Sequence, residues 1–466
     1  MTETVLYRRT LWAGTALYAV LLLWALWHYR ERMLFSDMAF QTFQILRNGS
    51  VQVQSGRFGA AGTQVFAWAA QYFHWPLKGV LLSYSAGHVL FQAAAFAWVA
   101  GVLRQWRWAW VLMLQSVLMT AHTFYWLSEP PQGLAFLIAL LAWVDTRTTG
   151  ARLSIAHWLL WGAASVTVVY FHPLMIYVLV YAAVFRWLTQ EEASRRRLWW
   201  VAVGLAAVVW WVKYKILPLD WYDAMSMSRA EAFRELWPHW WNIQSNRDFI
   251  HWTLTDYYLW PVFWAGAVGL LWRRGFRWAA AWAAVFPLAY ILLINVPFHA
   301  GDQQFYLENM YLPLALMVGL PVVMMLFEAP TGSRRTRWAW WALVLVLGAR
   351  TGHIVWRQAA WGARLEWVET LAMRPDNPPK MLIKEEKLPK DLLKFTWGIP
   401  YETALLTALE GPQAVRLVFP AHAISDSLAG QKRLFLGSFK HYPFDQLPAF
   451  YLQPDTRTGY VWYPEN

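Results

Sequence analysis

Apolar runs of the length that crosses a lipid bilayer constrain this chain more than any other feature. A membrane-spanning helix needs ~20 mostly apolar residues. The runs that approach this length occupy residues 11–28, 79–103, 107–127, 131–144, 155–171, 173–187, 199–216, 258–272, 278–296, 310–327 and 338–355. Several are short, notably 131–144 and 173–187, and these are expected to be tilted helices, helices extended by flanking residues, or broken helices that line a cavity. The sequence therefore predicts an all-α polytopic membrane protein with about eleven transmembrane helices.

Arginine is distributed unevenly between the loops that join these runs. The loops on one side of the predicted bundle carry Arg8, Arg9, Arg104, Arg107, Arg147, Arg152, Arg186, Arg195, Arg196, Arg197, Arg273, Arg274, Arg277, Arg334, Arg335 and Arg337. The short loops on the other side, 128–130, the turn at His172 and 297–304, contain neither Lys nor Arg. Cytoplasmic loops are the ones enriched in Lys and Arg. We therefore expect a cytoplasmic N-terminus, and the odd number of spans places the C-terminus outside.

The composition excludes several classes of protein. The net charge of +12 resides largely in these loops, where it faces anionic lipid headgroups and gives no indication of nucleic-acid binding. Many of the 36 Trp residues lie at the ends of apolar runs, as interfacial anchors do. The chain has no Cys, so disulfides, thiolate metal sites and Cys nucleophiles are excluded. It has no Walker A, HExxH or GxSxG motif.

Three longer segments are expected on the outer side. Residues 1–355 form the predicted transmembrane domain, with outer loops at 29–78 and 217–257, and residues 356–466 form a C-terminal extracytoplasmic domain. Strand-like runs at 415–419 and 433–436, separated by turn residues, predict a small mixed α/β fold for this domain. No repeat relates the two halves of the chain.

The first outer loop contains an amphipathic segment, residues 35–50. Asp37, Gln41, Gln44 and Asn48 recur at helical spacing and form one polar stripe, whereas most other positions are apolar. The pattern predicts a helix that lies in the membrane interface with its polar stripe toward a cavity. A second short amphipathic piece covers residues 63–75, and a flexible basic turn containing Arg57 lies between the two.

Ionisable residues at membrane depth are costly, and each is a candidate for a functional site. The candidates at the outer face are Glu129 in a sharp break between two runs, His172 in a hairpin, Lys213 at the end of a run, and His299, Asp302, Tyr306 and Glu308 before and within the tenth run. Arg350 lies about 12 residues into the last run, ~18 Å deep at 1.5 Å per residue. A buried Arg at that depth requires an anion, and a lipid phosphate is a natural partner.

These features together resemble the GT-C superfamily of integral-membrane glycosyltransferases. The resemblance rests on the early acidic residue Asp37 after the first span, the Glu129 turn, an outward C-terminal domain, and the segment 308–313, Glu-Asn-Met-Tyr-Leu-Pro. That segment is similar to the E-R-Y-x-x-P opening of a late span in many members. Asp37 is flanked by Ser36 and Met38, so the paired acids of some members are missing and a divalent metal is not indicated.

The resemblance implies an enzyme that transfers a sugar from a polyprenyl-phosphate-linked donor to a lipid, glycan or protein acceptor. It implies that Asp37 is the general base, with Glu129 as a second catalytic carboxylate. Residues of the outer face would bind the donor phosphate, namely Arg57, Lys213, His299 and Arg350. His172, Asp302, Tyr306 and Glu308 would be auxiliary. The resemblance also implies the inner membrane of a bacterium, a role in the cell envelope and no required cofactor.

Three other functions remain open on sequence grounds: a transporter or flippase for lipid-linked glycans, a glycan polymerase or ligase, and a non-catalytic subunit of envelope assembly. A transporter is expected to show two equivalent halves, which this chain lacks. The enzyme hypothesis makes a geometric prediction. Asp37, Arg57, Arg350 and at least one of Glu129, His299 and Asp302 should converge on a single outward cavity.

Overall fold

The computed structural model describes residues 3–146, 154–190, 193–216, 218, 221–327, 333–421 and 428–463, excepting the side chains of 193–198 and 222. Two of the arginines that predicted the topology, Arg147 and Arg152, lie outside these residues. The side chains of Arg195, Arg196 and Arg197 also lie outside the described part.

The structure is mostly helical, with 72% of its residues in helices. Within the described residues, six helices are long and apolar enough to cross a membrane: Glu3–Trp27, Leu77–Val102, Trp199–Ile216, Arg277–Phe298, Gln304–Leu326 and Arg334–Met373. Two shorter apolar helices, α8 (Ile155–Phe171) and α9 (Met175–Thr189), accompany them. The chain is thus an all-α polytopic membrane protein with a few added strands.

The expected count of eleven spans is not supported. In the predicted run 107–127 only α6 (Trp106–Val117) is helical, and it has 12 residues. In the predicted run 258–272 the helix is α14 (Trp260–Arg273), which has 14 residues. These lengths fall short of the ~20 residues that a span requires. The remainder of the run 107–127 is an irregular turn whose residues are buried among other helices. Apolar residues of a buried turn have the same hydropathy as those of a helix, which is why the sequence pattern overcounted.

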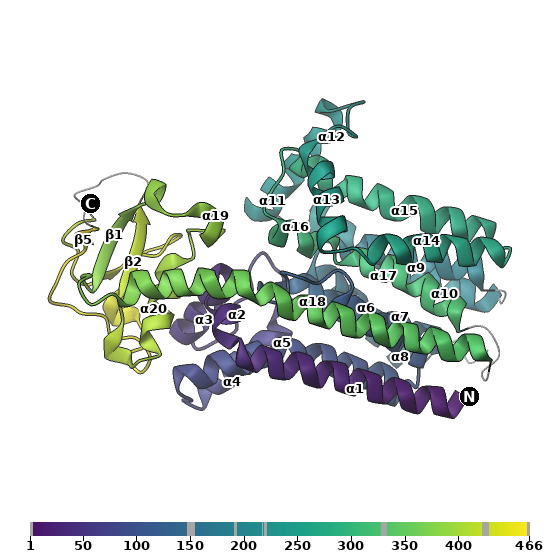
Figure 1. Ribbon diagram of the computed structural model, residues 1–466, viewed down its shortest axis with the longest axis horizontal. Helices are drawn as coiled ribbons and strands as arrows, with labels where there is room; N and C mark the ends of the chain where they lie inside the picture. Colours follow the sequence, from purple (N-terminus) through teal and green to yellow (C-terminus); the bar gives the residue numbers. More distant parts are fainter. Residues whose placement is uncertain are drawn as a thin grey trace.

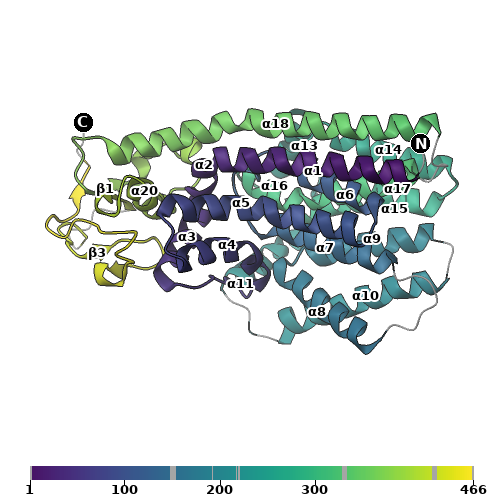
Figure 2. The same cartoon turned by 90° about the horizontal axis from the view of Figure 1, so that it is seen from below.

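The two ends of the bundle along its long axis are built from different parts of the chain. The N-terminus lies at one end of that axis and the C-terminal unit at the other, while α18 (Arg334–Met373) runs along the whole molecule (Figure 1, Figure 2). A helix of 40 residues is ~60 Å long at 1.5 Å per residue. Figure 2 shows the first turn of α18 beside the N-terminus.

Arginines of the predicted inner loops gather at the N-terminal end. The Arg9 guanidinium lies 5.7 Å from the ring centre of Trp340, in the first turns of α18. Arg107 donates to the carbonyl of Phe327 at 2.8 Å, and Arg274 donates to the carbonyl of Met325 at 2.7 Å. These three arginines of the predicted inner loops therefore lie at one end of the fold.

Other long helices complete the bundle. They are α1 (Glu3–Trp27), α5 (Leu77–Phe96), α7 (Glu129–Thr146), α10 (Ala193–Trp211), α15 (Arg277–Asn295) and α17 (Pro313–Leu326). Short helices occupy the opposite end, toward the C-terminal unit: α2 (Tyr29–Met33), α3 (Ser36–Asn48), α4 (Ala61–Tyr72), α11 (Trp221–Ser228), α12 (Ala232–Glu235), α13 (Gln244–Thr255), α16 (Gln304–Tyr311) and α19 (Lys390–Leu393). The predicted interfacial helices 35–50 and 63–75 correspond to α3 and α4.

The C-terminal unit is a small α/β structure. β1 (Lys380–Lys384) is the middle strand of a parallel sheet between β2 (Leu417–Ala421) and β5 (Val461–Trp462). Helix α20 (Ile399–Ala408) packs against β2, and β3 (Leu434–Phe435) pairs with β4 (Tyr442–Pro443). β2 and β3 fall on the two runs that the sequence marked as strands. Because α18 continues without a break to Met373, the predicted domain boundary at 355/356 falls inside a helix.

A buried ion pair joins this unit to the bundle. Arg364 of α18 and Glu402 of α20 are 2% and 0% exposed, and their side chains approach to 2.5 Å. Arg364 also donates to the carbonyl oxygens of Leu393, at 3.0 Å, and Leu34, at 3.3 Å. The second oxygen of Glu402 accepts the backbone N–H of Ser36 at 2.7 Å. One pair of side chains therefore connects α18, α20, the last residue of α19 and the start of α3.

Breaking this pair should loosen the C-terminal unit. Glu402→Ala leaves a buried guanidinium without its anion, which costs about 3–5 kcal/mol. We expect a lower melting temperature in detergent and faster proteolysis of residues 374–398. Glu369→Ala is the matched control, because Glu369 pairs with Arg30 at 2.8 Å on the exposed side of the same helix. An exposed pair contributes about 0–1 kcal/mol, so equal effects of the two substitutions would contradict the assigned role of Glu402.

Candidate active site

A cavity of about 880 Å³ lies between the helical bundle and the C-terminal unit. Its walls come from α3, the 54–57 turn, the 126–128 loop and the start of α7, the 172–174 turn and the start of α9, α11, and the ends of α15 and α16. Phe395, Trp397 and Phe439 close it from the C-terminal side. The volume lies within the range typical of small-molecule sites.

Asp37 lies in the first turn of α3 and lines this cavity. The indole N–H of Trp126 donates to one carboxylate oxygen of Asp37 at 2.8 Å. Within the described part of the chain, no second group hydrogen bonds to this carboxylate. Burial raises the pKa of Asp37 to about 6, aided by the nearby charge of Glu129 and opposed by the Trp126 hydrogen bond and by Arg57. A carboxylate with such a pKa is ionised at neutral pH and accepts a proton more readily than an ordinary Asp.

The backbone before Asp37 is held in an uncommon conformation. Ser36 has φ of 23°, a region that non-glycine residues rarely adopt. Its N–H donates to Glu402, and a Cβ added to Gly398 would lie 2.5 Å from its Cα. The chain can therefore pass this closely only because residue 398 is glycine. Strained backbone that the surroundings hold in place is common at functional sites.

Charged groups cluster around Arg57 in the cavity. Arg57 lies 3.2 Å from a carboxylate oxygen of Asp223 in α11 and 3.9 Å from one of Glu129. His172 lines the same region, and burial together with the positive charges of Arg57 and Lys213 keeps its pKa well below the usual value. His172 is therefore neutral at pH 7, and its Nδ1 accepts the N–H of Leu174 at 3.3 Å.

The structure brings together about half of the predicted site residues. Those that line the cavity are Asp37, Arg57, Glu129, His172 and Tyr306. Lys213 is buried beside them, with its ammonium 4.5 Å from the Tyr170 ring centre and 5.0 Å from that of Tyr214. His299 and Asp302 are exposed and do not line the cavity. The expected convergence therefore holds for Asp37, Arg57 and Glu129 and fails for Arg350.

Arg350 has a different role from the one predicted. It is fully buried and donates to the backbone carbonyls of Val117 at 3.1 Å, Thr120 at 2.9 Å, and Asp256. Carbonyl oxygens at the end of α6 and in the turn after it supply the negative potential that we had assigned to a lipid phosphate. Arg350 does not line the cavity, so the structure does not support the prediction that it binds the donor phosphate.

Glu308 is likewise structural. Its carboxylate accepts the backbone N–H groups of Ala121, His122 and Thr123, the Thr123 hydroxyl and the Tyr257 hydroxyl, at 2.7–3.1 Å. It is 0% exposed. These bonds satisfy the backbone of the turn that ends the third predicted span. An auxiliary catalytic role does not fit, since the carboxylate is enclosed by these donors.

Other cavity residues were not predicted. Asp223 and Arg229 come from the outer loop 217–257, which the sequence marked only as rich in Trp, Tyr, Asp and Arg. Trp126 was interpreted as an interfacial anchor, although its indole donates to Asp37. Nothing in the local sequence distinguishes an anchoring Trp from one that holds a carboxylate, because the difference lies in a partner 89 residues away.

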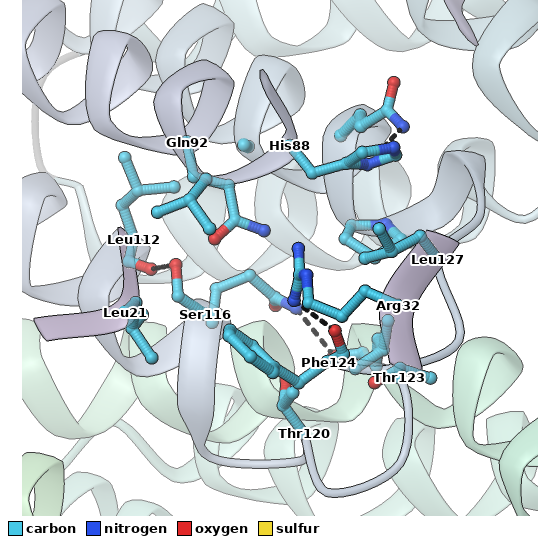
Figure 3. A pocket seen from close by; sticks show the side chains of 16 residues that line it. Leu21, Arg32, His88, Gln92, Leu112, Ser116, Thr120, Thr123, Phe124 and Leu127 are labelled. Carbon is cyan, nitrogen blue, oxygen red and sulfur yellow. Dashed lines mark hydrogen bonds between the residues drawn. The ribbon is translucent and has the colours of Figure 1, made fainter. Parts of the chain in front are cut away.

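A second, much smaller cavity of about 30 Å³ lies inside the bundle (Figure 3). Arg32 borders it and donates to Ser85 and to the carbonyl of Phe124, and His88 contacts Gln132 at 3.2 Å. This volume accommodates a water molecule or two but no substrate. Among the residues that the structure describes, no group of three or more His, Asp or Glu side chains is arranged to hold a metal ion.

Comparison with known proteins identifies no relative. Searches of protein-family models, of curated proteins and of solved structures found no match to this chain. The case for a function therefore rests on the residues of the cavity.

The pKa of Asp37 predicts a pH-dependent stability. Its value of about 6 exceeds the ~3.9 of an unfolded chain, so the folded protein loses stability as the pH rises from about 4 through about 6. Asp37→Asn removes the ionisation and retains an oxygen for Trp126. We expect its melting temperature in detergent to exceed that of the wild type at pH 7 and to approach it at pH 4.

Asp455 provides a control of opposite sign. Hydrogen bonds from Thr458 and from the backbone of Arg457 lower its pKa to about 2. Asp455 therefore stabilises the fold above pH ~4, and this stabilisation is lost as the pH falls toward 2. Asp455→Asn should lower the melting temperature at pH 7. A melting-temperature difference for Asp37→Asn that does not change between pH 4 and 7 would contradict the raised pKa.

Proposed function

We propose that the chain is a membrane-embedded glycosyltransferase that takes a sugar from a polyprenyl-phosphate-linked donor. The observation that carries the proposal is the position of Asp37: a carboxylate with a pKa of about 6, which accepts a hydrogen bond from Trp126, in a large cavity that also contains Arg57 and Arg229. Such a transfer needs a base for the incoming nucleophile and positive charge for the departing phosphate. The cavity holds both kinds of group.

The proposed step is a displacement at the anomeric carbon. An acceptor hydroxyl gives its proton to Asp37, and its oxygen forms a bond to the anomeric carbon of the sugar. The bond from that carbon to the phosphate oxygen breaks, and the lipid phosphate leaves with the electron pair. Arg57, positioned by Asp223 and Glu129, stabilises the charge that develops on the phosphate. Neutral His172 beside it is a further hydrogen-bonding group.

Apolar residues of the same cavity suit a lipid-linked donor. The cavity is also lined by apolar and aromatic residues from helices of the bundle, namely Tyr177, Trp210, Leu293, Ile294 and Met310. A polyprenyl chain that enters from the bilayer would pack against these side chains while its phosphate reaches Arg57. The arrangement therefore combines an apolar wall for the carrier with charged groups for its head.

The proposed location is the outer face of a bacterial inner membrane. The arginines gathered at the N-terminal end support a cytoplasmic N-terminus. With the cavity at the opposite end, the reaction would take place at the periplasmic face, and the C-terminal unit would lie in the periplasm.

Mass spectrometry of lipid-linked sugars and envelope glycans tests the proposal. One strain has the gene for this protein deleted. Three further strains carry the same deletion and express the wild type, Asp37→Asn or Asp302→Asn at matched levels. We expect the deletion and Asp37→Asn to accumulate one polyprenyl-linked sugar and to lose one glycan modification, because the acceptor is no longer deprotonated. Asp302→Asn should behave as wild type, since Asp302 is exposed and does not line the cavity.

The opposite result would favour another class of protein. If Asp37→Asn restores the glycan while the deletion lacks it, Asp37 is not a base. A transporter or an assembly subunit would then explain the deletion better than a transferase.

A further inference from the structure

Gln41 is a buried amide one turn after Asp37 on α3. It is 6% exposed, and both side chains line the same cavity. Residues four apart on a helix lie on one face, one above the other. A group that approaches the Asp37 carboxylate along α3 from the direction of Gln41 therefore also approaches the Gln41 amide.

A chain of hydrogen bonds fixes which end of this amide faces the cavity. The backbone of Gln52 determines the orientation of Gln64: its N–H donates to Gln64 Oε1 at 2.6 Å, and its carbonyl accepts from Gln64 Nε2 at 2.9 Å. Gln64 Nε2 also donates to Gln41 Oε1 at 3.1 Å, and the Tyr84 hydroxyl donates to the same oxygen at 2.7 Å. Two donors thus hold the Gln41 oxygen and leave its Nε2 as the free end.

The free end is a donor without a partner. Within the described residues, Gln41 Nε2 makes no hydrogen bond, and this nitrogen is accessible from the cavity. An amide N–H₂ donates and does not accept. The cavity beside the proposed base therefore presents an oriented donor for an oxygen atom of a ligand.

Aromatic side chains form the adjoining wall. The ring centre of Phe40, the residue before Gln41, lies 6.1 Å from that of Trp397 and 5.5 Å from that of Phe439. Trp397 and Phe439 lie 5.1 Å apart and belong to the C-terminal unit. Phe439 lines the cavity and is 61% exposed, so this aromatic wall reaches the surface of the C-terminal unit.

We propose that this end of the cavity is a subsite for a glycan acceptor. Gln41 Nε2 donates to a hydroxyl oxygen of the acceptor sugar, and the C–H face of the sugar ring packs on the aromatic wall of Phe40, Trp397 and Phe439. A neutral donor beside aromatic rings suits a sugar, whereas a lipid chain would leave the buried amide unpaired. The assignment rests on the proposed transferase function, since it names the acceptor of that reaction.

Binding to an array of immobilised bacterial surface oligosaccharides tests the subsite without requiring turnover. The full-length protein is labelled, reconstituted in nanodiscs and applied as wild type, Gln41→Glu, Gln41→Met and Trp397→Ala. Gln41→Glu keeps an oxygen for Gln64 and Tyr84 but removes the donor. We expect binding of one oligosaccharide class by the wild type and about tenfold weaker binding by each variant, the loss of roughly one hydrogen bond or ring contact.

Gln44→Glu is the matched control. Gln44 lies on the same helix but does not line the cavity, and its amide donates to the Tyr442 hydroxyl at 2.9 Å. Its variant should bind as the wild type does, and melting temperatures of all variants would identify any that fail to fold. Tyr84→Phe removes one of the two bonds that orient Gln41, so it should weaken binding less than Gln41→Met.

The outcomes separate this inference from the proposed function. Asp37→Asn should retain glycan binding while losing transfer. Wild-type transfer without glycan binding, or binding that Gln41→Glu and Gln41→Met leave unchanged, would overturn the subsite and leave the transferase proposal intact. Binding of a peptide or phospholipid probe in place of glycans would also overturn it. Glycan binding that depends on Gln41 in a protein with no transfer activity would uphold the subsite as a binding site and reject the enzyme.

Discussion

The ion pair between Arg364 and Glu402 is the constraint on which the site depends. Taking both charges out of water is costly, and the cost is offset only when the remaining donors and acceptors are also satisfied. Here they are, because Arg364 reaches the carbonyls of Leu34 and Leu393 while Glu402 accepts from Ser36. The interaction therefore specifies one arrangement of the C-terminal unit over the bundle. It also holds Ser36 in the strained conformation from which α3 begins, one residue before Asp37.

The electrostatics of the cavity follow from this closure. Asp37 lies in the cavity between the bundle and the C-terminal unit, and burial is the main reason for its raised pKa. Trp126 and Arg57 oppose the shift without cancelling it. A carboxylate that is costly to ionise weakens the fold at neutral pH, and this cost is typical of residues kept for function. Ionised Asp37 therefore lowers the stability of the folded protein at neutral pH, at the position proposed for the base.

The sequence predicted the parts of this site that belong to one segment and missed those that depend on distant partners. The sequence analysis selected polar and charged residues that lie in or beside apolar runs. These include Asp37 with its polar stripe, Arg57, Glu129 and His172. Arg350 and Glu308 are also charged residues in apolar runs, yet their side chains form hydrogen bonds with backbone groups of residues 117–123. The sequence does not show where a buried charge finds its partner, nor that apolar residues such as those at 118–121 leave the helix.

The four residues of the polar stripe on α3 do not share one set of contacts, although they share one helix face. All four of its residues were expected to face one cavity, but a 13-residue helix contacts different neighbours along its length. Asp37 and Gln41 face the cavity, Gln44 donates to Tyr442 of the C-terminal unit, and Asn48 donates to Gln52 beyond the helix end. The first two turns therefore carry the proposed chemistry, and the last two hold the helix in place. Because Gln52 also orients Gln64, and through it Gln41, the anchoring end of α3 determines which atom of Gln41 its functional end presents.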